Sequence, residues 1–306
     1  MPELPEVESL RLGLLRTVVG QKVMRVSVRA SKLVSGKGNI RTASDKKARE
    51  FKRGLEGEKI VGIDRRAKNL IFKFSYDKIM LVHLKMTGQL VYIPNLKASN
   101  SKLKASRVIG GHPIEASEHS LPHKHTHIIF ELQKGILYYN DTRTFGYLLY
   151  FPSEAVFLAG NHFEGIGLEP HDVNFTLQYF VAALGNRTGT LKKVLMDQRV
   201  VTGLGNIYAD EVAFAAGVRP TRQVKTLKSK EIAAIYKTIQ KIIPEAIRQG
   251  GSSVANYLLV DGSRGNYARQ HKVYGKSGEL CQSCRQALRT TNLNGRTTVF
   301  CPSCQQ

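Results

Sequence analysis

The spacing of apolar residues along the chain changes from helical to strand-like near Gly20. Apolar side chains recur every three or four positions from Val7 to Val18, which predicts a helix over residues 6–19 that Gly20 ends. Alternation with a period of two follows in "KVMRVSVRA", "KNLIFKFS", "IMLVHLKMTGQLVYI" and "FGYLLYFP", and "THIIFELQKGILYYND" predicts a hairpin turning at Lys134-Gly135. One helix followed by many antiparallel strands predicts a β-rich first domain, a sandwich.

After Pro152 the apolar pattern becomes helical again. "TLQYFVAALG", "LKKVLMD", "IYADEVAFAAG" and "SKEIAAIYKTIQKIIPEAIRQGG" predict an α-helical second domain between about 170 and 250. Two polar stretches without periodicity, residues 94–125 and 252–275, are predicted to be long surface loops. The pattern indicates a multidomain α+β chain.

The charge of the chain is strongly positive. Its 306 residues contain 46 Lys plus Arg against 24 Asp plus Glu, a formal net charge of +22. Such a field attracts polyanions, and nucleic acid is the first candidate. An acidic membrane surface is the rival partner, but we find no basic amphipathic helix with an aromatic face. A charge that only keeps the protein soluble is the simplest alternative.

The sequence gives no indication of membrane insertion or export. No apolar run approaches the length needed to span a bilayer. The acidic N-terminus lacks the basic segment and apolar core of a signal peptide. With 42% hydrophobic residues the chain can bury a sizeable core, and we expect it in the cytoplasm.

All four cysteines lie in the last 26 residues, as two C-x2-C pairs separated by sixteen residues. Four thiolates in this arrangement suit one tetrahedral zinc ion, with a β-hairpin carrying one pair at each end. Two disulfides are the alternative, which a reducing compartment disfavours. The predicted ligands of one structural Zn²⁺ are Cys281, Cys284, Cys301 and Cys304.

The opening stretch "MPELPEVE" contains groups suited to covalent catalysis. Removal of Met1 would make Pro2 the terminus and its ring nitrogen a free secondary amine, which can attack an electrophilic carbon. Glu3 could serve as a general acid or base, and Glu6 could face the same site. A helix N-terminus disfavours a protonated amine, whereas the two glutamates favour one, and the sequence leaves the balance open. Ordinary capping by glutamates in a first helical turn is the alternative.

Two further segments contain candidate binding groups. His123, His125 and His127 alternate, so on a strand they would share one face, as a metal cluster or as solvated or DNA-facing imidazoles. In "GLGNIYADE" two glycines allow a tight turn before a helix that begins at Asn206. Exposed N–H groups and an N-cap amide there predict an anion-binding corner, and a plain capped helix is the alternative.

The combination of "MPELPEVE" with the C-terminal cysteine module closely resembles the formamidopyrimidine-DNA glycosylase family. Further motifs in the family's order are "RRAKNL" (65–70), "HLKMTGQL" (83–90), "NDTRTFGYL" (140–148), "LMDQRVVTGLGNIYADE" (195–211) and "GRTTVFCPSC" (295–304). The resemblance runs nearly from end to end. It implies a catalytic β-sandwich domain at 1–152, a linker at 153–172, a helix–two-turn–helix domain with a lesion loop at 173–275 and a zinc finger at 276–306.

The resemblance also implies roles for individual residues. In the family the processed N-terminal proline attacks C1′ of the damaged nucleotide, a Schiff base forms, and β- then δ-elimination nicks the strand. The resemblance implies that Pro2 is the nucleophile, that Glu3 is the catalytic acid and that Glu6 supports them. It implies that Lys68 lies at the phosphates as a proton donor in elimination, and that Arg296 has a similar role in δ-elimination. The implied DNA-binding residues are His83, His125, Arg143, Arg187 and Asn206. The implied intercalating residues, which fill the gap left by the extruded base, are Met86, Arg143 and Phe145.

The chain departs from the family pattern in the segments that face DNA. The usual aspartate-proline-arginine-arginine-phenylalanine is "DTRTF" at 141–145, Lys85 stands where glycine is common, and the loop at 94–122 is long. These departures do not affect the nucleophile, but they could alter DNA affinity or the preference for the opposite base.

The expected function is therefore that of a bifunctional DNA glycosylase and abasic-site lyase for oxidised purines in base excision repair. Its expected partner is damaged double-stranded DNA, bound by a monomer in the cytoplasm with nucleoid association and no membrane contact. One alternative is the related endonuclease VIII type, which prefers oxidised pyrimidines. The other is a non-catalytic, zinc-stabilised DNA-binding protein.

Overall fold

The computed structural model describes residues 1–36, 41–95, 108–111, 121–185, 187–252 and 266–306, and for 108–111 the backbone alone. These residues form two compact units. The N-terminal unit contains Met1–Pro2, Glu6–Glu164 and Ser252. The C-terminal unit contains Glu3–Pro5, Gly165–Gly251 and Asn266–Gln306.

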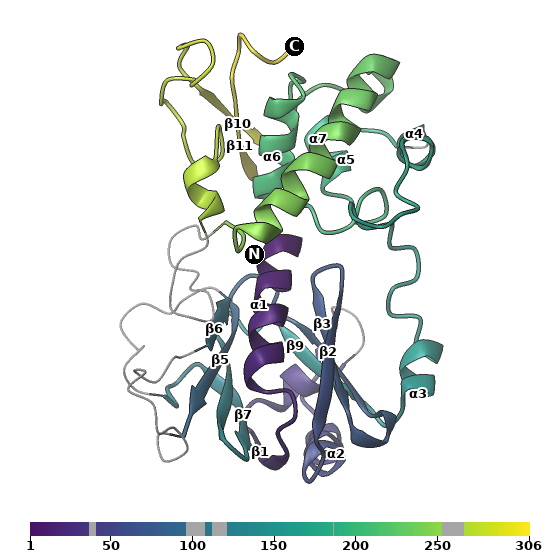
Figure 1. The fold of residues 1–306 in the computed structure, drawn as a ribbon, viewed down its shortest axis with the longest axis vertical. Coiled ribbons are helices and arrows are strands. Elements are labelled where there is room, and N and C mark those ends of the chain that lie inside the picture. The colour runs from purple at the N-terminus through teal and green to yellow at the C-terminus, as the bar shows by residue number, and fades with distance from the viewer. Residues whose placement is uncertain (37–40, 96–107, 112–120, 186, 253–265) are drawn as a thin grey trace. The chain divides into compact units, whose positions relative to one another are not determined.

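The N-terminal unit is a sandwich of two antiparallel sheets, as the alternating pattern predicts (Figure 1). One sheet has the strand order β1-β7-β8-β5-β6 and the other β2-β3-β4-β9 among the described residues. The strands are β1 Val23–Val28, β2 Ile60–Arg66, β3 Asn69–Phe74, β4 Ile79–His83, β5 Gly88–Pro94, β6 Val108–Gly111, β7 Thr126–Leu132, β8 Gly135–Asp141 and β9 Tyr147–Phe151. The helices are α1 Leu4–Thr17, α2 Asp45–Leu55 and α3 Glu154–Ala159, with 3-10 turns η1 Ser31–Val34 and η2 Ser75–Asp77.

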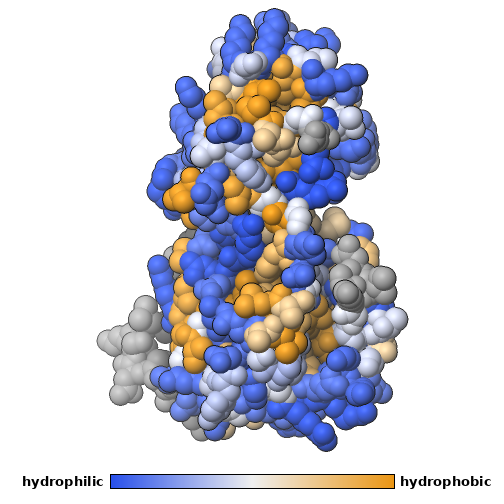
Figure 2. Space-filling view, turned by 90° about the vertical axis from the view of Figure 1, so that its right-hand side faces the viewer, coloured by the Kyte–Doolittle hydropathy of each residue, from blue (hydrophilic) through white to orange (hydrophobic). Residues whose placement is uncertain are grey.

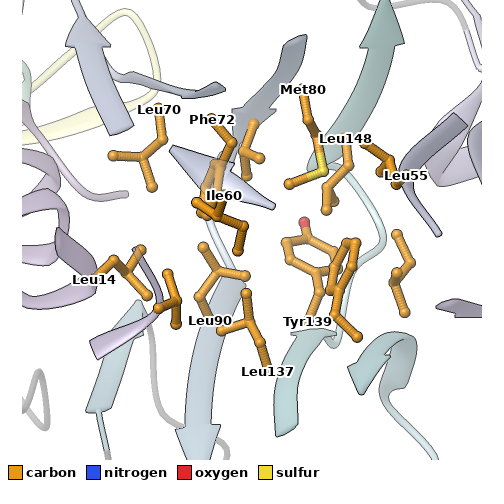
Figure 3. Packing of buried hydrophobic residues seen from close by; sticks show 14 of the residues in the cluster. Leu14, Leu55, Ile60, Leu70, Phe72, Met80, Leu90, Leu137, Tyr139 and Leu148 are labelled. Carbon is orange, nitrogen blue, oxygen red and sulfur yellow. The ribbon is translucent and has the colours of Figure 1, made fainter. Parts of the chain in front are cut away.

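The core of the N-terminal unit lies between its two sheets. Figure 3 shows Phe72 and Met80 of one sheet opposite Leu90 and Tyr139 of the other. The apolar stripe of α1 packs into the same cluster through residues such as Leu14. Burying a side chain of this size favours folding by about 1.5–3 kcal/mol relative to leaving it exposed, so this cluster is a main source of the sandwich's stability.

Three elements of the N-terminal unit differ from the sequence prediction. Helix α2 was not predicted because its sequence is mostly charged and only Phe51 and Leu55 are buried, too few to give a clear periodicity. Helix α3, capped by the Ser153 side chain, lies in the segment predicted to be a linker. Strand β6 lies within the stretch predicted to be a loop at 94–125, because it pairs with the exposed edge of β5. Residues 96–107 and 112–120 of that stretch are outside the described residues.

The C-terminal unit is helical and ends in a β-hairpin (Figure 1). Its elements are α4 Leu177–Gly185, α5 Leu191–Leu195, α6 Asn206–Ala215, η4 Val224–Thr226, α7 Ser229–Arg248, η5 Tyr267–Gln270, β10 Arg289–Leu293 and β11 Arg296–Phe300. The apolar faces of α4, α6 and α7 form its core, together with Leu4. All four predicted helical segments are confirmed. Most of the predicted loop at 252–275 is outside the described residues.

One face of each unit has a mostly polar surface. Figure 2 shows one face of each unit, on which hydrophilic side chains predominate around smaller apolar patches. Within the described ranges, we find no helix with the length and apolar character that crossing a bilayer requires.

Candidate functional site

The opening residues are buried rather than solvated. Met1 is 45% exposed, whereas Pro2 and the carboxylates of Glu3 and Glu6 are buried. The helix begins at Leu4, and Pro5 lies in its first turn, where a missing N–H does no harm. The opening stretch is therefore built into the fold.

The Glu3 carboxylate lies at the N-terminus of α6 within the C-terminal unit. Its Oε2 accepts the N–H of Gly205 at 2.6 Å, and its Oε1 accepts that of Ile207 at 2.8 Å. A longer contact of 3.4 Å joins it to the N–H of Tyr208. A carboxylate in this position satisfies free N–H groups of the first turn and interacts favourably with the helix dipole.

Glycines make this approach possible. Gly203 has a φ of +100°, and a Cβ added there would lie 2.4 Å from the Leu4 side chain. A Cβ on Gly205 would lie 2.6 Å from the Glu3 carboxyl carbon. The predicted tight turn is confirmed, and it receives the protein's own N-terminal segment.

The prediction that Asn206 is the N-cap of this helix is wrong. The cap residue is Gly205, which has no side chain, and Asn206 is the first helical residue. Glu3 supplies the acceptor that an Asn cap would have provided. The Oδ1 of Asn206 is buried and has no hydrogen-bond partner among the described residues.

Glu6 binds a different segment, within the N-terminal unit. Its Oε1 accepts the N–H of Ser252 at 2.7 Å, and both residues are buried. Ser252 is where the predicted surface loop at 252–275 begins. Glu6 therefore fixes the start of that loop relative to α1.

Lys68 lies in the two-residue turn between β2 and β3. Arg66 pairs with Asn69 across the hairpin, and Ala67 in the turn has a φ of +57°. The Lys68 side chain is only 6% exposed. The sequence "RRAKN" thus forms a tight hairpin turn that holds a buried lysine.

His83 ends β4 among several cations. Its Nδ1 accepts the N–H of Lys85 at 2.9 Å, so the proton of the neutral ring is on Nε2. Burial, followed by the positive charges of Lys85, Lys68 and Arg41, lowers the pKa of His83 to about 3. The Arg41 guanidinium also lies 4.1 Å from the centre of the Tyr147 ring. These groups form a cationic surface beside a neutral histidine.

Lys85 occupies the position where the family commonly has glycine, and it has a φ of +52°. Glycine adopts this conformation without strain, whereas lysine rarely does. Burial and the charge of Arg41 lower the pKa of Lys85.

The three residues predicted to intercalate are brought together by the structure. Met86 and Phe145 are 43% and 50% exposed. The Arg143 guanidinium lies 4.6 Å from the centre of the Phe145 ring, and its Nη1 is 3.3 Å from the Met86 sulfur. The set projects from the sandwich as one exposed cluster.

Asp141, which sequence reasoning missed, organises this cluster. Its buried carboxylate accepts the N–H of Arg143 at 3.1 Å and that of Gly146 at 2.8 Å, and it binds the Thr87 hydroxyl. One carboxylate thereby connects the turn that carries Met86 to the turn that carries Arg143. Its position at the start of the "DTRTF" turn was the available signal.

The three alternating histidines do not form a metal cluster among the described residues. The Nδ1 of His123 accepts the N–H of His125 at 3.1 Å, and the Nε2 of His127 lies 2.8 Å from the carbonyl oxygen of Asp141. His125 is half-buried, next to the His123 ring. The cysteine set is the group of potential metal ligands in the described part of the chain.

Arg187 and Arg296 line one basic cavity of about 500 Å³ in the C-terminal unit. Five basic side chains and one carboxylate, Asp197, line it. Asp197 is bound by Arg199 through two contacts of 3.0 Å, and Arg187 lies 3.5 Å from it. The Nε of Arg187 is buried without a hydrogen-bond partner in the described ranges. The cavity therefore has an excess of positive charge suited to phosphate.

The four cysteines converge at the ends of the predicted hairpin. Their Sγ atoms all lie within 4.8 Å of one another, with Cys284 and Cys301 at 3.4 Å and Cys281 and Cys304 at 3.8 Å. Disulfides would need about 2.05 Å. Ligands of tetrahedral zinc at about 2.3 Å would be roughly 3.8 Å apart, so the donor set fits one zinc ion.

The zinc hairpin presents Arg296 at its tip. β10 and β11 are joined by Asn294-Gly295, both with positive φ, the sequence that two-residue hairpin turns prefer. Arg296 is the first residue of β11 and is exposed.

Comparison with known proteins agrees with this architecture. Residues 1–148 match the model of the formamidopyrimidine-DNA glycosylase N-terminal domain. Residues 166–257 match that family's H2TH domain, and residues 278–306 match the zinc finger found in FPG and IleRS.

Whole-length relatives and solved structures are also similar. Formamidopyrimidine-DNA glycosylases of Pediococcus pentosaceus and Carboxydothermus hydrogenoformans are 37% and 35% identical, covering all of this chain and at least 99% of each relative. The Lactococcus lactis Fpg in complex with abasic-site DNA is 32% identical over 99% of both chains, with a TM-score of 0.82. The domain order, the cysteine module and this similarity over the whole length show that the chain belongs to the formamidopyrimidine-DNA glycosylase family.

Proposed function

We propose that this protein is a bifunctional DNA glycosylase and abasic-site lyase that removes oxidised purines, such as 8-oxoguanine and formamidopyrimidines, in base excision repair. The observation that carries the proposal is the Pro2–Glu3 pair, with the Glu3 carboxylate held by two short backbone hydrogen bonds. Relatives named formamidopyrimidine-DNA glycosylase, and Lactococcus lactis structures containing abasic-site or Fapy-dG DNA, support it.

The reaction begins at Pro2. Once Met1 is removed, the neutral ring nitrogen attacks C1′ of the damaged nucleotide and the base leaves with the electron pair of its glycosidic bond. Glu3 acts as a general acid or base at this centre. Because backbone hydrogen bonds already hold its carboxylate in place, the carboxylate needs little reorganisation during the reaction. Ring opening of the sugar then leaves an iminium ion between Pro2 and C1′.

Two eliminations follow from the iminium ion. Loss of the C2′ proton forms a double bond as the C3′–O3′ bond breaks, and the downstream strand leaves with a 5′-phosphate. Loss of the C4′ proton then extends the conjugation as the C5′–O5′ bond breaks, and the upstream strand keeps a 3′-phosphate. Each phosphate leaves with the electron pair of its broken bond and needs a nearby positive charge.

Basic and hydrogen-bonding side chains would contact the phosphates. Lys68, His83 and His125 are proposed phosphate contacts in the N-terminal unit, and Arg187, Asn206 and Arg296 are proposed contacts in the C-terminal unit. The cations around His83 and the excess positive charge of the Arg296 cavity support these roles. A neutral His83 would contribute an Nε2–H donor rather than a charge.

Met86, Arg143 and Phe145 would fill the space left by an extruded nucleotide. Their exposure and mutual contacts support this role. Apolar side chains can stack in the gap, while Arg143 can donate hydrogen bonds to the unpaired base opposite.

The zinc ion would be structural. Bound by Cys281, Cys284, Cys301 and Cys304, it would hold the two ends of the hairpin together and take no part in the chemistry. Folding of the hairpin would then fix the position of Arg296.

We further propose a division into a catalytic domain at 1–152, a linker at 153–172, a DNA-binding domain at 173–275 and a zinc finger at 276–306. The order of the family matches supports this division. We propose that the protein acts as a monomer in the cytoplasm and associates there with the nucleoid, which its +22 charge favours.

Defined duplexes test the proposed activity. An 8-oxoguanine duplex should be cleaved faster than a thymine-glycol duplex, and both should be compared with an undamaged control. Cleavage of the pyrimidine lesion alone would instead assign the endonuclease VIII type. Binding without cleavage of either lesion or of an abasic site would leave a non-catalytic DNA-binding protein.

A further inference from the structure

A buried ion pair joins α5 to α6 in the C-terminal unit. The Nζ of Lys192 lies 2.8 Å from Oδ1 of Asp210, and the two side chains are 2% and 0% exposed. Lysine and aspartate are almost never buried to this extent unless they are paired.

Stability alone does not account for this pair. Burial lowers the pKa of Lys192 and raises the pKa of Asp210 to about 6. Apolar residues of similar volume usually fill such a site with equal or greater stability. A buried pair of this kind is better explained by the geometry that it imposes on its neighbours.

Both members of the pair bind the same strand of the zinc hairpin. The Nζ of Lys192 donates to the carbonyl oxygen of Thr297 at 2.9 Å. Oδ2 of Asp210 accepts the N–H of Val299 at 3.2 Å. The strand is β11, and Thr297 directly follows Arg296 in it. The ion pair therefore fixes the backbone from which Arg296 projects.

The next residue of α6 binds a different segment, residues 272–274. Glu211 accepts the N–H groups of Lys272, Val273 and Tyr274 at 2.8–3.1 Å. Among the described residues, Glu211 makes no hydrogen bond with β11. Asp210 and Glu211 thus hold different segments, which allows their effects to be separated.

We propose that Lys192 and Asp210 are positioning residues for Arg296, which they aim at the phosphate that leaves in δ-elimination. This inference rests on the proposed role of Arg296. Lys192 lines the same cavity as Arg296, so a shift of β11 would displace the guanidinium from that cavity. The earlier steps depend on Pro2 and need no contact with β11.

The proposal can be tested in single-turnover reactions of the zinc-loaded enzyme with a labelled abasic-site duplex. The double variant Lys192→Met with Asp210→Leu replaces the pair by apolar groups and removes both hydrogen bonds to β11. Asp210→Ala is a single variant, which removes the acceptor for Val299 and the counter-charge of Lys192. Tyr236→Phe is the matched control, because it removes a hydrogen bond to Phe175 in the same unit without contacting β11. Zinc content and circular dichroism establish that each variant is folded.

The readout is the ratio of the β-product, a 3′-unsaturated aldehyde, to the β,δ-product, a 3′-phosphate. We expect both pair variants to raise this ratio at least threefold, while borohydride trapping on Pro2 stays within twofold of the parent. Arg296→Ala should shift the ratio in the same direction, and adding the double variant to it should produce no further shift. Tyr236→Phe should leave the ratio unchanged.

The two levels of the proposal fail differently. If Arg296→Ala leaves the product ratio unchanged, the proposed role of Arg296 is wrong. If Arg296→Ala shifts the ratio but the pair variants do not, or if they slow trapping and both eliminations equally, the positioning inference is overturned. If the double variant does not fold, the ratio measured with Asp210→Ala decides in the same way.

Discussion

Glu3 caps a helix that begins more than 200 residues later in the sequence: its Oε2 accepts the N–H of Gly205 at 2.6 Å. The same carboxylate binds the N–H of Ile207, so both of its oxygens are engaged. The residue proposed as the catalytic carboxylate is thus also a helix cap, although it caps α6 rather than the helix that directly follows it in the sequence.

Glu3→Ala should destabilise the C-terminal unit. The change leaves two buried N–H groups without an acceptor, which costs about 1–3 kcal/mol of the free energy of unfolding. Glu3→Gln keeps one acceptor oxygen and should lose less. Urea unfolding of the zinc-loaded protein measures both, with Glu50→Gln as a surface control. If Glu3→Ala and Glu3→Gln were as stable as the parent protein, the cap would contribute nothing to stability.

Removal of zinc should weaken DNA binding by at least tenfold. Without the metal, the hairpin has only a small apolar core around Val273, Leu288 and Val299, and small zinc modules unfold without their ion. Fluorescence anisotropy with an abasic-site duplex, after chelation and a verified zinc assay, measures the effect. Addition of Zn²⁺ should restore binding, whereas Mg²⁺ should not. Undiminished binding by the metal-free protein would contradict this role of the hairpin.

Phe145→Ala should reduce affinity for an abasic-site duplex by roughly tenfold. Aromatic stacking on a base is worth about 1–3 kcal/mol, and tenfold corresponds to about 1.4 kcal/mol. Tyr76, which is 84% exposed in the same unit, provides the control variant Tyr76→Ala, and its affinity should not change. The role of Phe145 would be refuted by equal losses in the two variants or by no loss in either.

His83 should make stability depend on pH below about 6.5. Its folded-state pKa of about 3 lies below the ordinary value of 6.5, so between these values the unfolded chain binds more protons. Stability should therefore fall as pH decreases from 6.5 toward 3. In His83→Gln this part of the slope should be smaller, as measured by urea unfolding at a series of pH values. Parallel curves for the two proteins would contradict the assignment.

The elements with clear periodicity could be predicted from the sequence. The stripe from Val7 to Val18 gave α1, and the alternating segments gave the sandwich, because each has one face in the core. Helix α2 lacked such a face, with only Phe51 and Leu55 buried, and β6 depends on pairing with β5 rather than on its own pattern.

Candidate residues were predictable where local sequence determines their environment. The hairpin spacing of the cysteines and the Asn294-Gly295 turn are local signals, and the cysteine cluster is confirmed. The contacts of Glu3 with Gly205 and of Lys192 with Asp210 join separate segments of the chain, and no local pattern indicates them. The Asn206 cap was wrong for the same reason, since the acceptor comes from the other end of the sequence.

The most direct test of the account is the mass of the borohydride-trapped complex with an abasic-site duplex, followed by peptide mapping. We predict that the mature chain lacks Met1 and that the DNA adduct is on the tryptic peptide Pro2–Arg11, at the proline nitrogen. An active enzyme that retains Met1, or an adduct on a lysine such as Lys68, would contradict the central claim that Pro2 is the nucleophile.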